Sequence, residues 1–184
     1  DMNIAYSEFS QENKQQALFY IQNTPNYCIT CHSRTDHGRS DLAANYDANL
    51  DNFNSFEKAD YYFAVRHYKQ GLDQILKTKT QKNSSSWTDL SFLRALAIAT
   101  RAKQDPILTK KIVSKIRKSK TSYRKDTSYW LRAIKTWQAE KSVQKNDTLE
   151  KAKKLIIQAR KHKKESRGYI EYLRASSILH DIFL

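Results

Sequence analysis

The chain has very little glycine and proline, with three and two residues respectively among 184. Folds rich in β-turns need both residue types repeatedly, because glycine supplies positive φ and proline presets the turn. Their scarcity therefore predicts an all-α fold. Hydrophobic residues make up 39% and aromatic residues 11%, enough for one sizeable domain or a small one plus a larger one.

Long hydrophobic runs are also missing. No apolar stretch approaches the roughly 20 residues that a membrane-spanning helix needs. The sequence starts at Asp1 without the apolar segment of a signal peptide. We therefore expect a soluble chain in a processed or trimmed form.

Acidic side chains are scarce beyond residue 56. Residues 1–56 carry three bases and seven acids, a net charge of −4, within a total of +14 for the chain. Residues 57–184 therefore carry +18. We expect two regions, a mildly acidic segment over 1–56 and a basic domain over 57–184. This uneven distribution of charge indicates what kind of partner each region can bind, and not which fold it adopts.

The chain has only two cysteines, and both lie in Cys28-Ile29-Thr30-Cys31-His32. This spacing is the attachment signature of c-type haem. Two thiols separated by two residues can both form thioether bonds to the vinyl groups of one porphyrin. The histidine that follows can then ligate the iron.

Three other interpretations of these residues stay open: a disulfide, a redox Cys-x-x-Cys and a zinc site. The redox motif accompanies a strand–helix–strand pattern, which the sequence does not show. A zinc site could use Cys28, Cys31, His32 and His37. Adjacent ligands such as Cys31 and His32 fit poorly around one tetrahedral ion.

The motif resembles that of the c-type cytochromes. The resemblance implies one covalent haem c on Cys28 and Cys31, with His32 as the proximal axial ligand. It also implies electron transfer, and an exported location in the bacterial periplasm or on another extracytoplasmic face. No catalytic triad, carboxylate dyad or phosphate loop stands out, which favours an electron-transfer protein over an enzyme.

The second axial ligand of the iron is expected to be His67. The chain between the motif and His67 is long enough to return over a haem. Met2 is the next candidate, followed by His180 in the last helix, and a five-coordinate or otherwise unusual iron site stays open. His37 follows His32 too closely to reach the other face of the ring. His162 lies in a basic run that we expect to be solvated.

Helical periodicity organises the whole chain. It predicts one helix after Ser10 and a short helix near residues 41–50. Paired helices follow, over 56–70 and 72–80 with Gly71 as the break, and over 88–103 and 106–118. A third pair is centred on Trp130 and Ala152, and a last helix covers 167–183. Ser55 is the expected cap of the first paired helix.

The paired helices resemble tetratricopeptide repeats in several places. Tyr61-Tyr62-Phe63-Ala64 with Tyr68-Lys69-Gln70-Gly71 resembles the first helix of a repeat, and Trp130, Ala133, Ile134 and Trp137 match its spacing. Ala152, Ile156 and Ala159 match the spacing of its second helix, and the last helix has Tyr169, Tyr172, Leu173 and Ser176 in similar places. The resemblance covers residues 57–184 and implies a curved stack with a concave face for a partner. The repeat period is irregular, so a generic helical bundle remains the alternative.

Basic runs on the paired helices are expected to bind a partner. The residues expected to do so are Lys115, Arg117, Lys118, Lys153, Lys154 and Lys161. The partner would be an acidic redox protein or a membrane-bound respiratory complex, with a membrane surface as a further candidate. The aromatics fall mostly at core spacing, which argues against nucleic acid. The alternative hypothesis is a zinc-binding helical-repeat scaffold or a nucleic-acid-binding adaptor.

Overall fold

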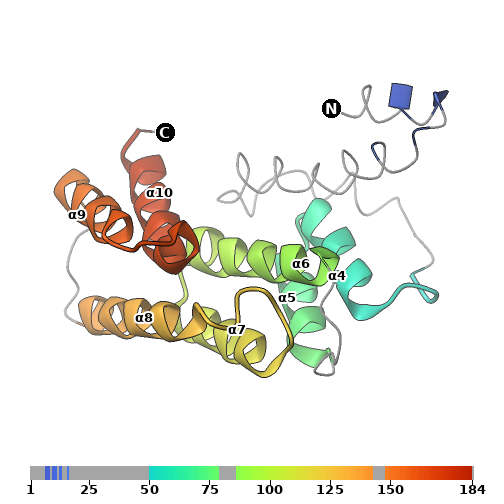
Figure 1. Ribbon diagram of the computed structural model, residues 1–184, viewed down its shortest axis with the longest axis horizontal. Helices are drawn as coiled ribbons and strands as arrows, with labels where there is room; N and C mark the ends of the chain where they lie inside the picture. The colour runs from blue at the N-terminus through green and yellow to red at the C-terminus, as the bar shows by residue number, and fades with distance from the viewer. Residues whose placement is uncertain are drawn as a thin grey trace.

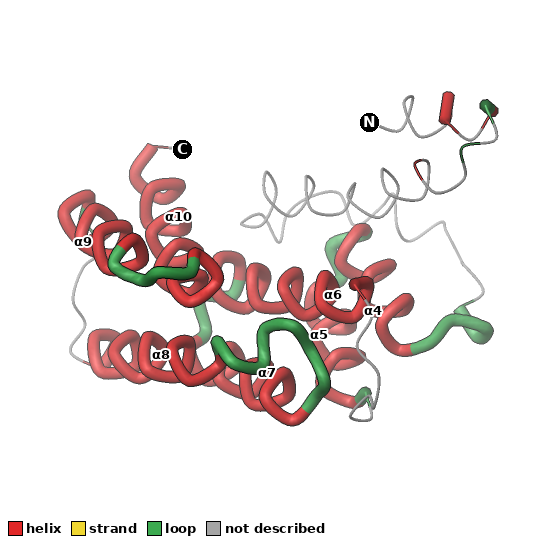
Figure 2. The backbone as a smooth tube through the Cα atoms, viewed as in Figure 1, coloured by secondary structure: helices red, strands yellow, loops and turns green. Residues whose placement is uncertain are grey.

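The computed structural model describes residues 50–78, 86–142 and 148–183, together with Ser7, Glu8, Ser10, Gln11, Asn13 and Gln16. These residues form α-helices, one π-helical turn and one 3₁₀ turn, and no strand occurs among them (Figure 2). The predicted all-α fold is confirmed for this part of the chain. None of its helices is both long and apolar enough to cross a membrane. The helices expected near 10–24 and 41–50 fall almost wholly outside the described residues.

Helix α4 (Ser55–Ala64) is capped by Asn54 and not by Ser55, the expected cap. Asn54 Oδ1 accepts hydrogen bonds from the backbone N–H groups of Phe56, at 2.9 Å, and Glu57, at 3.2 Å. In return, Glu57 Oε2 accepts from the Asn54 N–H at 2.7 Å. This reciprocal capping box satisfies donors that the start of a helix leaves open.

Helix α5 (Tyr68–Lys77) follows after a turn at residues 65–67, where Arg66 has a φ of 62°. Gly71, the predicted break, lies inside α5 instead. A Cβ at Gly71 would come within 2.4 Å of a ring carbon of Phe63. The glycine therefore marks a close approach between α4 and α5, and not the end of a helix.

Helix α6 (Ser86–Ala97) continues into the π-helical turn η1 (Ile98–Ala102), and α7 (Pro106–Lys118) follows. Asp105 caps α7 by accepting hydrogen bonds from the N–H groups of Ile107 and Leu108, at 2.8 and 3.0 Å. The predicted ranges 88–103 and 106–118 are thus confirmed within a few residues. Together α6 and η1 run through the middle of the molecule (Figure 1), and residues 95–100 are all buried.

The helices of the predicted third pair do not pack closely on one another. Helix α8 (Thr127–Ser142) packs against α7, whereas α9 (Leu149–Arg160) packs against α10 (Tyr169–Phe183). A 3₁₀ turn, η2 (Glu165–Gly168), links α9 to α10. Helical periodicity indicates which face of a helix is buried, but not which neighbouring helix covers that face. The two helices occur where they were predicted, but the predicted pairing of α8 with α9 is wrong.

Two apolar clusters hold the helices together. The larger joins α4 to α8 and the first turns of α10, and Phe63, Phe92 and Trp130 are fully buried in it. The smaller lies between α9 and α10 and consists of Ala152, Leu155, Ala175 and Ile178. The α9/α10 hairpin therefore has a small core of its own, in addition to its contact with the main one.

Candidate functional site

The predicted haem-attachment residues Cys28, Cys31 and His32 lie outside the described residues, as does Met2. Their expected roles stay predictions. Among the residues that the structure describes, no group of three or more His, Cys, Asp or Glu side chains is placed to hold a metal ion. The described part of the chain contributes His67 and the basic surfaces.

His67 lies in the turn between α4 and α5, where it is the N-cap of α5. Its side chain is half-buried, and its ring stacks on Tyr62 with centroids 6.4 Å apart and ring planes 19° from parallel. The next residue, Tyr68, is the one that enters the core, where it is 2% exposed. His67 is therefore ordered by a neighbouring ring without being a core residue.

Lys115 points back into the protein instead of outward to a partner. Its Nζ donates hydrogen bonds to the backbone carbonyls of Leu76, at 3.3 Å, and of Thr78. These carbonyls lie at the end of α5, where helix carbonyls lack intrahelical donors. Burial and the nearby charge of Lys118 lower the pKa of Lys115. The Lys115 ammonium therefore ties α7 to α5 and is engaged within the fold.

The other cations expected to bind a partner are exposed and lie on two different helices. Arg117 and Lys118 belong to the last turn of α7. Lys153 and Lys154 lie along α9, and Lys161 is its C-cap. The Nζ of Lys153 is 2.9 Å from Glu150 Oε1, in an exposed pair that contributes little to stability.

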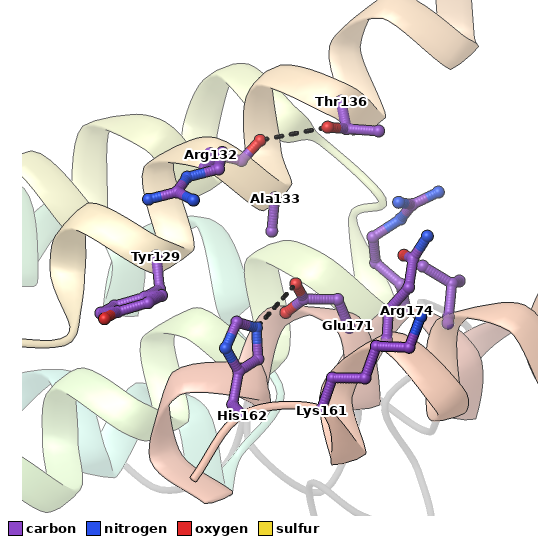
Figure 3. A pocket seen from close by; sticks show the side chains of 10 residues that line it. Tyr129, Arg132, Ala133, Thr136, Lys161, His162, Glu171 and Arg174 are labelled. Atoms are coloured by element: carbon purple, nitrogen blue, oxygen red, sulfur yellow. Dashed lines mark hydrogen bonds and ion pairs between the residues drawn. The ribbon is translucent and has the colours of Figure 1, made fainter. Parts of the chain in front are cut away.

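A cavity of about 300 Å³ lies between α8 and the α9/α10 hairpin, and its wall includes charged residues that the sequence did not single out. Figure 3 shows His162 and Glu171 facing one another across it. His162 Nε2 is 3.8 Å from Glu171 Oε1, and the imidazole meets the Tyr129 ring edge-on at 5.3 Å. His162 is thus half-buried against α8 and α10, and not simply solvated as its basic neighbours suggest.

The charges around this cavity are largely paired. Arg174, which is 4% exposed, donates to Glu140 Oε2 at 2.7 Å, and the Lys151 ammonium lies 3.1 Å from the same oxygen. Burial alone would raise the pKa of Glu140, but Arg174 and Lys151 outweigh it and lower that pKa. Burial raises the pKa of Glu171. These charged contacts link α8 to the α9/α10 hairpin, and we refer to Glu140, Lys151, Glu171, Arg174 and His162 together as the polar joint. Arg174 is engaged in this joint through Glu140.

The sequence alone does not predict these contacts between α8 and α10, for a physical reason. Arg132 and Glu140 come from α8, whereas Glu171 and Arg174 come from α10. Nothing in the local pattern of either helix indicates that the other will supply the counter-charge. The only local signal is a glutamate and an arginine at helical spacing in the first half of α10, between apolar and aromatic residues.

Comparisons with protein-family models, with curated proteins and with solved structures find no match to this chain. A functional conclusion must therefore come from the residues themselves. Those residues are the Cys28–His32 motif, the ordered imidazole of His67 and the exposed cations of α7 and α9.

Proposed function

We propose that this protein is a mono-haem c-type cytochrome that transfers electrons. The observation that carries the proposal is Cys28-Ile29-Thr30-Cys31-His32, which holds both cysteines of the chain. Cys28 and Cys31 would hold the haem through thioether bonds, and His32 would ligate the iron. The bound haem would supply a one-electron redox couple, whose potential depends on axial ligands and burial.

We assign His67 as the second axial ligand. Its ring is half-buried and lies against Tyr62, so it samples fewer rotamers than a solvated imidazole. Ordering it on a metal therefore costs less side-chain entropy. A pair of imidazole ligands favours a lower potential than a histidine–methionine pair.

The basic domain would dock an acidic redox protein or a membrane-bound respiratory complex. The exposed Lys153, Lys154 and Lys161 of α9 would form the contact, within a domain of net charge +18. Such a field accelerates encounter with an acidic surface. The antiparallel hairpin α4/α5, followed by α6 and α7, supports a tetratricopeptide-like stack at the start of this domain.

The direct test is to express the chain with an export signal in a bacterium that attaches c-type haem. We expect a red protein with a Soret band and a haem-sized mass increment that survives denaturation. Cys28→Ala and Cys31→Ala each leave a single thiol, so attachment through two bonds should be lost in both. A colourless protein that binds zinc, or two-bond attachment in either variant, would contradict the proposal.

The ligand assignment has its own test. His67→Ala should convert a six-coordinate low-spin haem to a high-spin one, visible in the absorption and magnetic-resonance spectra of the folded protein. His162→Ala is the matched control, because that imidazole already faces Glu171, and its spectra should stay unchanged. A low-spin spectrum that survives His67→Ala would show that another residue is the ligand.

A further inference from the structure

Helix α7 and the turn that leads into α8 concentrate positive charge and contain no acidic side chain of their own. The Asp89 carboxylate of α6 reaches the turn, where it accepts hydrogen bonds from the backbone N–H and the hydroxyl of Ser122. Residues 106–125 contain eight basic side chains and no acidic one: Lys110, Lys111, Lys115, Arg117, Lys118, Lys120, Arg124 and Lys125. The acids at both ends of this stretch are engaged elsewhere. Asp105 caps α7, and the buried Asp126 accepts a hydrogen bond from Ser166 at 2.7 Å.

A surface hollow of about 540 Å³ lies at this turn. It is lined by Ser114, Arg117, Lys118, Arg124, Thr127 and Ser128. Each of these side chains carries N–H or O–H groups, and none is a carboxylate. Within the described part of the chain, none of the three cations forms an ion pair. The hollow is therefore lined by three cations and three hydroxyl groups, of which the Thr127 hydroxyl already donates to a backbone carbonyl.

The backbone that carries these cations is held firmly. Arg117 and Lys118 belong to the last turn of α7, whose opposite face buries Ile112, Val113 and Ile116 completely. Across the hollow, the buried Thr127 donates its hydroxyl to the Arg124 carbonyl at 2.8 Å. A site on such fixed elements loses less entropy when a ligand binds.

We propose that this hollow binds a small ligand that carries two phosphoryl groups. A phosphoryl group offers three acceptor oxygens and a charge of about −1.5 to −2, so two of them balance three cations better than one does. A planar carboxylate offers only two oxygens and cannot use as many donors. The forked guanidinium groups of Arg117 and Arg124 suit phosphate oxygens in particular.

The volume of the hollow and the charge around it agree with this ligand class. About 540 Å³ exceeds what one inorganic phosphate fills and lies within the usual range for small-molecule sites. The like charges also repel one another, and the charge of Lys118 adds to burial in lowering the pKa of the neighbouring Lys115. A bound anion would relieve that repulsion, so it should stabilise the fold as well. This site is independent of haem attachment.

The test uses the full chain and inorganic pyrophosphate as the probe, with binding measured by calorimetry. Citrate, a carboxylate anion of comparable charge, is titrated at the same ionic strength. Arg117→Gln and Arg124→Gln should each weaken pyrophosphate binding by roughly tenfold or more, since each removes charged hydrogen bonds. Arg117→Lys keeps the positive charge but loses the forked guanidinium group. Its affinity for pyrophosphate should therefore lie between that of the wild type and that of Arg117→Gln.

The matched control is Lys153→Gln with Lys154→Gln, which removes two exposed charges from α9 and should leave pyrophosphate binding within twofold. All variants are compared for helix content, because the changed side chains are exposed and should not affect folding. Equal affinity for citrate and pyrophosphate would overturn the proposal. An equal loss in the α9 control would also overturn it, because it would indicate a diffuse charge effect.

The same ligand chemistry could come from a soluble diphosphate ester or from a lipid headgroup with two phosphoryl groups. Flotation with vesicles that contain cardiolipin, and with neutral vesicles, separates these sources. Pyrophosphate binding alone assigns the site to a soluble ligand. Cardiolipin binding that depends on Arg117 and Arg124 assigns it to a headgroup. Binding of neither probe would refute the site.

Discussion

The two ends of helix α6 are covered by hairpins that are held in different ways. At its start, α4 and α5 join the main apolar core through Phe56, Phe63, Leu72 and Ile75. Phe56 meets Phe92 of α6 edge-on, with ring centroids 5.4 Å apart. The attachment of this hairpin is mainly the burial of apolar surface, which salt does not screen.

At the other end, the α9/α10 hairpin is attached to α8 by many polar contacts. The Trp130 indole N–H donates to the Ser166 carbonyl at 2.6 Å, and Asp126 holds Ser166 and Arg167. Arg174 and Lys151 meet at Glu140. Within the described part of this hairpin, Ile170 and Leu173 are the only buried residues that belong to the main apolar core.

This difference predicts where the protein opens first. Apolar burial gives way only when the whole core opens, whereas charged contacts weaken with salt and with protonation. The α9/α10 hairpin should therefore detach under mild conditions while α4 to α8 stay folded. That hairpin also carries Lys153, Lys154 and Lys161, so partner binding and local opening would be coupled.

The largest expected effect concerns a buried ion pair, Arg94 with Asp60, which is the exception at the otherwise apolar end of α6. Arg94 donates to Asp60 Oδ2 at 2.8 Å, both side chains are under 10% exposed, and Ser91 donates to the same oxygen. Burial raises the pKa of Asp60 even beside Arg94. Arg94→Met should strand this carboxylate and cost about 3–5 kcal/mol in the free energy of unfolding by urea.

The control for that change is the double variant Asp60→Leu/Arg94→Met. It removes both charges and should recover much of the loss, because an apolar pair of similar volume can replace a buried ion pair. A single variant that loses under about 1 kcal/mol would show that water reaches Asp60. The apolar description of this end would then be wrong.

Local sequence signals account for most helix boundaries and for few of the contacts between helices. Asp105-Pro106 predicts the start of α7 because both residues act within one turn. The prediction that Gly71 breaks the helix is wrong, because the contact that requires a glycine there, with Phe63, depends on how two helices approach one another. The role of Lys115 likewise depends on carbonyls 37 and 39 residues earlier in the chain. Long-range partners of this kind have no local pattern.

Substitutions of two glycines, one in each hairpin, test the same comparison with an effect on stability of intermediate size. A Cβ at Gly71 would meet the Phe63 ring at 2.4 Å, whereas one at Gly168 would meet the backbone Cα of Ala159 at 2.7 Å. Overpacking typically costs about 1–3 kcal/mol. Gly71→Ala should fall at the low end, because alanine also favours the helix by about 1 kcal/mol. Gly168→Ala should fall at the high end, because a backbone yields less readily than a ring.

The measurement for the glycines is urea unfolding together with hydrogen exchange of the α9 and α10 amides. Gly168→Ala should raise exchange in α9 and α10 more than in α4 and α5, and Gly71→Ala should do the reverse. The same exchange pattern in both variants would mean that the hairpins do not open separately.

The smallest expected effect concerns the polar joint itself. The lowered pKa of Glu140 means that its contribution to stability is complete above its ordinary pKa of 4.5 and is lost as pH falls through the lowered folded value. Glu140→Gln removes this contribution at every pH and should cost about 1 kcal/mol near neutrality, since Glu140 is partly exposed and the glutamine oxygen can still accept a hydrogen bond from the buried Arg174. The cost should shrink in acid and in 0.5 M salt.

Glu171 titrates within the same joint, and its effect must be separated from that of Glu140. The raised pKa of Glu171 acts in the opposite direction, because the folded protein takes up that proton first and gains stability as pH falls. Comparing the stability of Glu140→Gln with that of the wild type at each pH cancels the contribution of Glu171, since Glu171 is present in both. Glu150→Gln, on the exposed pair with Lys153, is the matched control and should leave exchange in α10 unchanged. If Glu140→Gln costs as much in acid as at neutral pH, the joint is held by packing, and both ends of α6 would be covered in the same way.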